Sequence, residues 1–135
     1  MKICIIAFEN KMDVTEELCV RFCGALCRHT VLATGTAAKQ IENTAGFRTE
    51  ALLGVSSGGI EQVTQLVACG DCGLVLCLRD ASPLHEPVPE LADLVRTCDF
   101  YGVPVATGLA TARILLQNLS VQNNAAMFKK GSGRN

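Results

Sequence analysis

Two short loops contain the residue types that could bind a phosphate group. Thr34-Gly35-Thr36 lies directly before a predicted helix, where unpaired N–H groups, two hydroxyls and a glycine suit an anion. An N-capping turn explains the same residues equally well. The second loop, Gly54-Val55-Ser56-Ser57-Gly58-Gly59, also ends at a predicted helix start but matches neither the Walker nor the dinucleotide pattern. Together they favour a small phosphorylated metabolite over a nucleoside triphosphate.

A third loop, residues 79–88, contains a dense group of titratable side chains. His85 titrates near neutral pH, and Asp80 could orient it or act beside it in proton transfer. A solvated loop in which Asp80 makes a local cap is the alternative. The loop follows the most apolar segment of the chain, so it is predicted to lie at the end of a buried strand.

The elements that must position these loops alternate regularly along the chain. Continuous apolar strands separated by helical periodicity indicate a parallel sheet covered on both faces. We therefore predict a single doubly wound α/β domain of flavodoxin size, spanning residues 1–119, with a five-stranded parallel sheet flanked by helices. The strands are predicted at 2–8, 30–33, 47–53, 73–78 and 103–106, and the helices at 14–27, 37–44, 60–69, 91–101 and 110–117.

In this class of fold, ligands bind beyond the carboxyl ends of the strands. That rule selects the loops at 9–13, 34–37, 54–59 and 79–88 as the candidate site. The polar segment 120–135 is predicted to be a tail that frays.

Composition excludes several classes of function. Twelve basic and thirteen acidic residues give a net charge of −1, so a nucleic-acid partner is not expected. No apolar run is long enough to cross a membrane and no secretion signal is recognised, so we expect a cytoplasmic protein.

Eight cysteines are a high count for 135 residues. In a reducing compartment we expect free thiols, with Cys19, Cys23 and Cys27 on one helix face packing into the core. Cys69 and Cys72 form a lone CxxC motif, a weak signal for zinc, and more plausibly mark the end of a helix. No metal or other cofactor is predicted, although a cysteine-based metal or redox function remains an alternative.

Several stretches resemble the methylglyoxal synthase family from Lys2 to about Gln117. The resemblance lies in the segments 29–36, 58–62, 78–80, 85–87, 98–107 and 110–112. It implies a five-stranded parallel sheet and a homo-oligomer, commonly a hexamer. It also implies a reaction without metal or cofactor, in which a carboxylate and a histidine convert dihydroxyacetone phosphate to methylglyoxal and phosphate.

The resemblance also assigns site residues. Asp80 and His85 are retained catalytic residues, whereas Ile60 stands at the family's catalytic Asp and Val88 at a second acid. The phosphate-binding positions it implies are Lys11, Thr34, Gly35, Thr36, Ala37, Gly54, Val55, Ser56, Gly58 and Gly59, together with His85. Phe8 replaces a histidine of the family and Met12 a lysine.

An isoleucine or a valine cannot accept a proton, and losing a general base typically lowers a rate by roughly 10² to 10⁴. We therefore predict a family member that binds a small phosphorylated or anionic metabolite and is catalytically impaired or inactive. The alternative is an active methylglyoxal synthase in which Asp80 or Glu61 has become the base.

Overall fold

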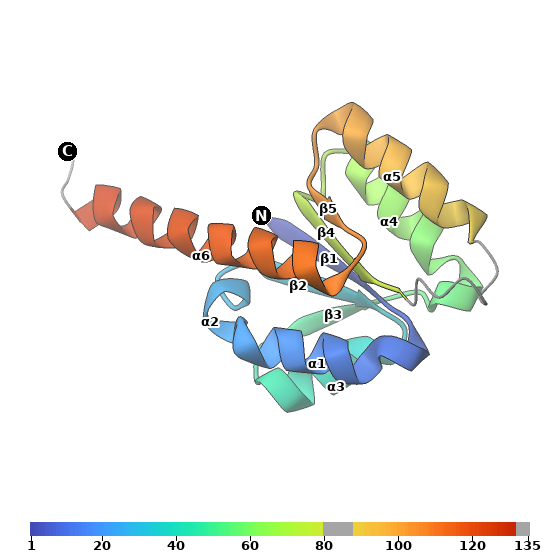
Figure 1. Ribbon diagram of the computed structural model, residues 1–135, viewed down its shortest axis with the longest axis horizontal. Coiled ribbons are helices and arrows are strands. Elements are labelled where there is room, and N and C mark those ends of the chain that lie inside the picture. The colour runs from blue at the N-terminus through green and yellow to red at the C-terminus, as the bar shows by residue number, and fades with distance from the viewer. Residues whose placement is uncertain (80–87, 132–135) are drawn as a thin grey trace.

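The architecture is a five-stranded sheet between two layers of helices, as a computed structural model describes it for residues 1–79 and 88–131, with side chains to residue 123 (Figure 1). The sheet order is β3-β2-β1-β4-β5, and every neighbouring pair is parallel. The predicted fold class is therefore confirmed. The strands are β1 (Lys2–Ala7), β2 (Thr30–Thr34), β3 (Thr49–Leu52), β4 (Leu74–Leu78) and β5 (Val105–Ala106).

The helices cover the two faces of the sheet unequally. One face is covered by α1 (Met12–Arg21), α2 (Cys23–Leu26), α3 (Ala37–Ala45) and α6 (Leu109–Gly131). The other is covered by α4 (Gly59–Ala68) and α5 (Pro89–Tyr101), which pack side by side (Figure 1). Two short 3₁₀ helices, η1 (Glu9–Lys11) and η2 (Val55–Ser57), follow β1 and β3.

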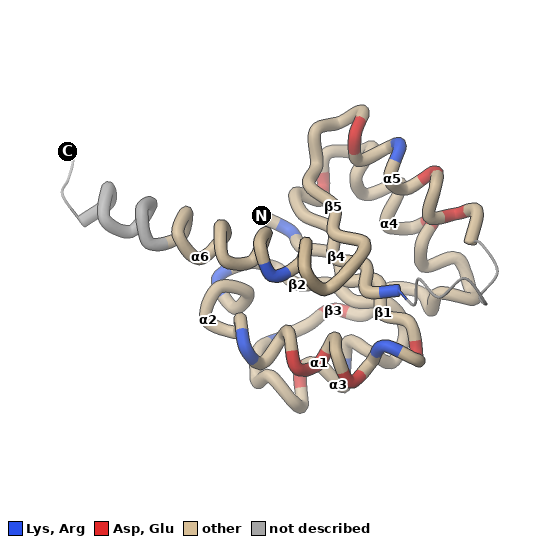
Figure 2. The backbone as a smooth tube through the Cα atoms, viewed as in Figure 1, with Lys and Arg blue, Asp and Glu red and all other residues tan. Residues whose placement is uncertain are grey.

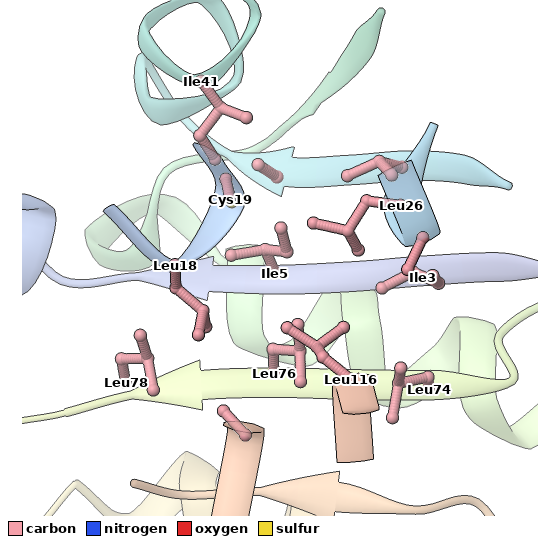
Figure 3. Close-up of a cluster of buried hydrophobic side chains, with 14 of the residues drawn as sticks. Ile3, Ile5, Leu18, Cys19, Leu26, Ile41, Leu74, Leu76, Leu78 and Leu116 are labelled. Carbon is pink, nitrogen blue, oxygen red and sulfur yellow. The ribbon is translucent and has the colours of Figure 1, made fainter. Parts of the chain in front are cut away.

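Alternation along the strands builds a separate core on each face. In β1, Ile3 and Ile5 point into the core beneath α1, α2, α3 and α6 (Figure 3), whereas Cys4 and Ile6 point into the core beneath α4 and α5. Because both faces are buried, the strand is apolar at every central position. The charged residues lie mainly on the helices and loops around the sheet (Figure 2). No described helix is long and apolar enough to cross a membrane.

The first predicted helix is two helices. The backbone of Phe22 has φ −110° and ψ 25°, which ends α1 at Arg21 and starts the short α2 at Cys23. The two helices thus meet at an angle, and Gly24, a poor helix former, lies in the first turn of the second. Apolar spacing continues through the break, so periodicity alone does not reveal it.

The last helix is longer than predicted. Instead of ending at Gln117, α6 continues to Gly131 and projects beyond the sheet (Figure 1), so residues 120–131 are helical. Asn123 holds it to the domain, because its Nδ2 donates to the Ala25 carbonyl at 3.3 Å and its Oδ1 lies 3.1 Å from His29 Nε2.

The cysteines differ widely in burial, and all eight are free thiols. The predicted shared face is wrong: Cys19 is buried, Cys23 is half-buried and Cys27 is exposed, because α1 ends before Cys23. Burial raises the pKa of Cys19 and of Cys77 to about 12, so both thiols stay protonated at neutral pH. The two cysteines of the CxxC motif differ in burial, because Cys69 is exposed and Cys72 is buried.

Thiol labelling is expected to follow this burial. Iodoacetamide at pH 8 should modify Cys27 and Cys69 first and Cys23 next. The buried cysteines (Cys4, Cys19, Cys72, Cys77 and Cys98) should react only after unfolding in guanidinium chloride. Peptide mass mapping of a time course measures this order. Rapid labelling of Cys19 in the folded protein would contradict the burial of this side chain.

Candidate site at the carboxyl ends of the strands

A cavity of about 780 Å³ lies where β1, β2 and β3 end. It brings together three of the four loops that the strand-end rule selects, from segments far apart in the sequence. Its lining residues are Ala7, Phe8, Glu9, Asn10, Met12, Thr34, Gly35, Thr36, Ala37, Gln40, Gly54, Val55 and Ser56. The volume is within the range typical of small-molecule sites.

Thr34 joins the first two strands at the floor of this cavity. It is 2% exposed, and its Oγ1 accepts a hydrogen bond from the Ala7 backbone N–H at 3.0 Å. The hydroxyl thus has a structural partner, and its own proton is still available for donation. Thr34 therefore combines a structural role with a position in the lining.

The residues after Thr34 present the start of α3 to the cavity. Gly35 has φ +58°, and its N–H donates to the Leu52 carbonyl at 3.0 Å, so this N–H extends the β2–β3 ladder. Thr36 is exposed, and its side chain makes no capping hydrogen bond. The first intrahelical bond shown is from Gln40 N–H to Thr36 O. The N–H groups of the first helical residues, beginning with Ala37, therefore have no helical acceptor of their own.

The loop after β3 is held tightly by its own backbone. The Gly54 carbonyl accepts hydrogen bonds from the N–H groups of Ser57 and Gly59, each at 2.9 Å. Gln62 on α4 fixes the preceding residue, because its Oε1 accepts the Leu53 N–H at 2.8 Å. A Cβ at Gly35 would lie 3.3 Å from the Gly54 Cα, so the close approach of the two loops leaves little room for a side chain at Gly35.

The apolar residues of the lining around β1 and β3 are Ala7, Phe8, Met12 and Val55. Ala7 and Met12 also pack against the core under α1, and Phe8 and Val55 against the core under α4. Glu9 is the charged residue of the described lining, and no Lys or Arg is part of it. Polar side chains enter the lining from all three loops: Glu9 and Asn10 after β1, Thr36 after β2 and Ser56 after β3.

The structure does not place every predicted site residue in the lining. Ile60 is 1% exposed and belongs to the core beneath α4 and α5. Gly58 and Gly59 shape the start of α4 behind the cavity, and Lys11 lies between two lining residues without lining it. Asp80 and His85 lie outside the described residues.

Six lining residues were not among the predicted binding positions: Ala7, Phe8, Glu9, Asn10, Met12 and Gln40. Glu9 and Asn10 follow a predicted strand, and the strand-end rule already marked that segment. Gln40 lies one turn into α3, so a search of the first turn after each phosphate-type loop would have found it. Across residues 1–79 and 88–131, no group of three His, Cys, Asp or Glu side chains could hold a metal ion.

Comparison with known proteins agrees with this architecture. No protein-family model matches the chain. The methylglyoxal synthase of Bacillus subtilis is 33% identical over 119 residues, covering 88% of this chain and 87% of that protein. The Burkholderia thailandensis methylglyoxal synthase is 36% identical over 119 residues, covering 88% and 92%.

A solved structure is similar as well. The crystal structure of methylglyoxal synthase from Elizabethkingia anophelis NUHP1 matches with a TM-score of 0.73 and 27% identity, over 85% of this chain and 76% of that one. Sequence identity above 30% over most of the chain and a shared parallel sheet lead to one conclusion: the chain belongs to the methylglyoxal synthase family.

Proposed function

We propose that this protein binds a small phosphorylated or otherwise anionic metabolite in the cavity at the carboxyl ends of β1, β2 and β3. The observation that carries the proposal is the start of α3. There, backbone N–H groups, the positive end of the helix dipole and the unbonded Thr36 hydroxyl face a cavity of about 780 Å³.

We further propose that the family's chemistry is impaired or absent. The resemblance of this chain to the family aligns Ile60 with an acidic residue. Ile60 is buried in an apolar core. Val88, at the second such position, packs against the same core. Neither side chain can accept a proton from a substrate carbon. Glu61, the neighbouring carboxylate, is exposed and does not line the described cavity.

Assay of the purified protein with dihydroxyacetone phosphate tests whether the family's chemistry is impaired. We expect phosphate release far below the typical enzyme rate of about 10 s⁻¹, because no described carboxylate other than Glu9 reaches the cavity. A turnover near that rate would instead support an active methylglyoxal synthase with a relocated base. Glu9→Gln, Glu61→Gln and Asp80→Asn would then identify the base by the loss of turnover.

Removing the Thr36 hydroxyl tests whether the anion binds at the start of α3. We expect Thr36→Val to weaken inorganic phosphate binding about fivefold, equivalent to about 1 kcal/mol for one lost hydrogen bond. Folding stability should change by less than about 0.5 kcal/mol, because this exposed side chain makes no capping bond.

Calorimetric titration with phosphate measures the first effect and urea unfolding the second. Thr111→Val is the matched control, because Thr111 is also exposed near a helix start but does not line the cavity. Equal phosphate affinity in wild type and Thr36→Val would contradict the proposed position of the anion.

A further inference from the structure

A second pocket lies where α1 and α2 meet α6, and it shares no lining residue with the cavity at the strand ends. Its volume is about 290 Å³. Beside it, α2 and α6 pack against each other (Figure 1). Helix α1 begins at Met12, which lines the cavity at the strand ends, and ends at Arg21, which lines the second pocket. The two sites therefore lie at opposite ends of α1.

Two arginines and no acidic residue are found among the described residues that line this pocket. Arg21 precedes α2 in the chain, and Arg28 follows it. Both side chains are exposed, and within the described residues neither forms an ion pair or a hydrogen bond. The cavity at the strand ends has the opposite character, because its charged lining residue is Glu9. The second pocket is therefore the better of the two for an anion that forms ion pairs.

The segments that build the pocket contain no acidic residue. The chain has none between Glu17 and Glu42, and none follows Asp99. Over its described length α6 accordingly has basic but no acidic positions (Figure 2). A pocket lined by charges of one sign raises the local concentration of small counter-ions. The positive character thus belongs to the surroundings of the pocket as well as to its two arginines.

One polar side chain of the pocket is held in place by the domain. Asn123 Nδ2 donates to the Ala25 carbonyl at 3.3 Å, and Asn123 Oδ1 lies 3.1 Å from His29 Nε2. An amide nitrogen has two hydrogens, so one remains for a ligand. The Ser120 hydroxyl donates to the Leu116 carbonyl at 3.1 Å and has no proton left to donate. Asn123 is therefore a donor whose position is fixed before a ligand arrives.

We propose that this pocket binds a small dicarboxylate. Arg21 and Arg28 each pair with one carboxylate, and the remaining N–H of Asn123 donates to one of them. A guanidinium group stays charged in proteins, and its planar fork matches the geometry of a carboxylate. The four residues of α2 separate the two arginines along the chain, so two separated acidic groups suit them better than a single charged centre. The site does not depend on the proposed anion site at the start of α3.

Calorimetric titrations at pH 7.5 with succinate, propionate and sulfate test the ligand class. Succinate has two carboxylates, propionate has one, and sulfate has both charges on one centre. We expect succinate to bind about tenfold more tightly than propionate, because its second carboxylate adds a charge-assisted hydrogen bond. Sulfate should also bind more weakly than succinate. Sulfate binding as tight as that of succinate would overturn the dicarboxylate class.

Variants of the two arginines test the position. Arg21→Gln and Arg28→Gln each remove one cation, so succinate should bind to each about tenfold more weakly, at the level of propionate. The urea midpoint should not change, because both side chains are exposed and unpaired within the described residues. Arg113→Gln is the matched control. Arg113 is exposed on α6 and does not line this pocket, so the variant loses the same charge without losing succinate affinity.

The outcomes are separate from those of the proposed function, which is tested with phosphate and Thr36→Val. If Thr36→Val weakens succinate binding and neither arginine variant does, the dicarboxylate binds at the start of α3 and the second pocket is not its site. If succinate does not bind to the wild-type protein, this inference is overturned and the phosphate site stands. An equal loss in Arg113→Gln would show that net charge attracts the ligand and would overturn the assignment to the pocket.

Discussion

An Ile60→Asp variant is expected to lose about 5 kcal/mol of folding free energy. Ile60 is 1% exposed and packs in the core beneath α4 and α5 with Val63 and Leu91. The substitution removes several buried methyl and methylene groups and places a carboxyl group among apolar side chains. Because typical domains are stable by only 5–15 kcal/mol, the loss is a large share of the total. Urea unfolding followed by circular dichroism measures it.

The pH dependence of this loss of stability separates the cost of burying a charge from the cost of the lost side-chain volume. Burial raises the pKa of the new carboxyl group in the folded state, whereas in the unfolded chain it titrates near 3.9. The folded state therefore binds more protons above that pH, so the stability of the variant should fall as pH rises from 5 to 8. Ile60→Asn is the control, because it has similar polarity and size but no charge. Identical stabilities of the Asp and Asn variants at pH 8 would contradict the buried position of residue 60.

A Gly59→Ala variant is expected to lose about 3 kcal/mol of stability and most of its phosphate binding. A Cβ at this position would overlap the Leu53 carbonyl oxygen and would lie 2.9 Å from the Gly54 carbonyl oxygen. Both obstacles are backbone atoms, so the loop must move rather than a flexible side chain. Gly54 lines the cavity, and its displacement disturbs the site directly. Urea unfolding and phosphate titration of the same preparation measure the two effects.

Gly24→Ala is the matched control for that prediction. A Cβ at Gly24 meets no atom within 4 Å, and the residue lies in α2 and does not line the cavity at the strand ends. Alanine is favoured over glycine in a helix, so this variant should be as stable as wild type or slightly more so. A Gly59→Ala protein that unfolds at the wild-type urea concentration and binds phosphate normally would show that the loop has room for a methyl group.

Strands β1, β2 and β4 were predictable because each is a short apolar run that is buried on both faces, whereas β3 exposes Glu50 and Ala51 and has a weaker signal. The sheet and three of the site loops followed from that pattern and from the strand-end rule. The bend at Phe22 was not predictable, since Leu18, Phe22 and Leu26 keep helical spacing across it. The length of α6 was missed because its polar residues were assigned to a tail, although a helix that projects from the domain can expose polar residues on most sides.

The site was predictable in its location but not in its hydrogen bonds. Thr34 was expected to be a phosphate donor, and the sequence offers no sign that its oxygen accepts the Ala7 N–H, because that contact joins two different strands. The burial of Ile60 is likewise a tertiary property. A helix start can turn any of its first residues toward a ligand, and only the packing of α4 on the sheet decides which one faces the core.

Because β1 lies at the centre of the sheet, its two edges can pair at different times during synthesis of the chain. Ile3 pairs with Val31 on one side and with Leu74 on the other. A growing chain can thus assemble the β3-β2-β1 half while the other edge of β1 still has unpaired backbone groups. At 5–20 residues per second, β4 follows β3 only after about 1–4 s. During that interval an apolar edge strand is open to pairing with other nascent chains, so a translational pause between β3 and β4 favours aggregation.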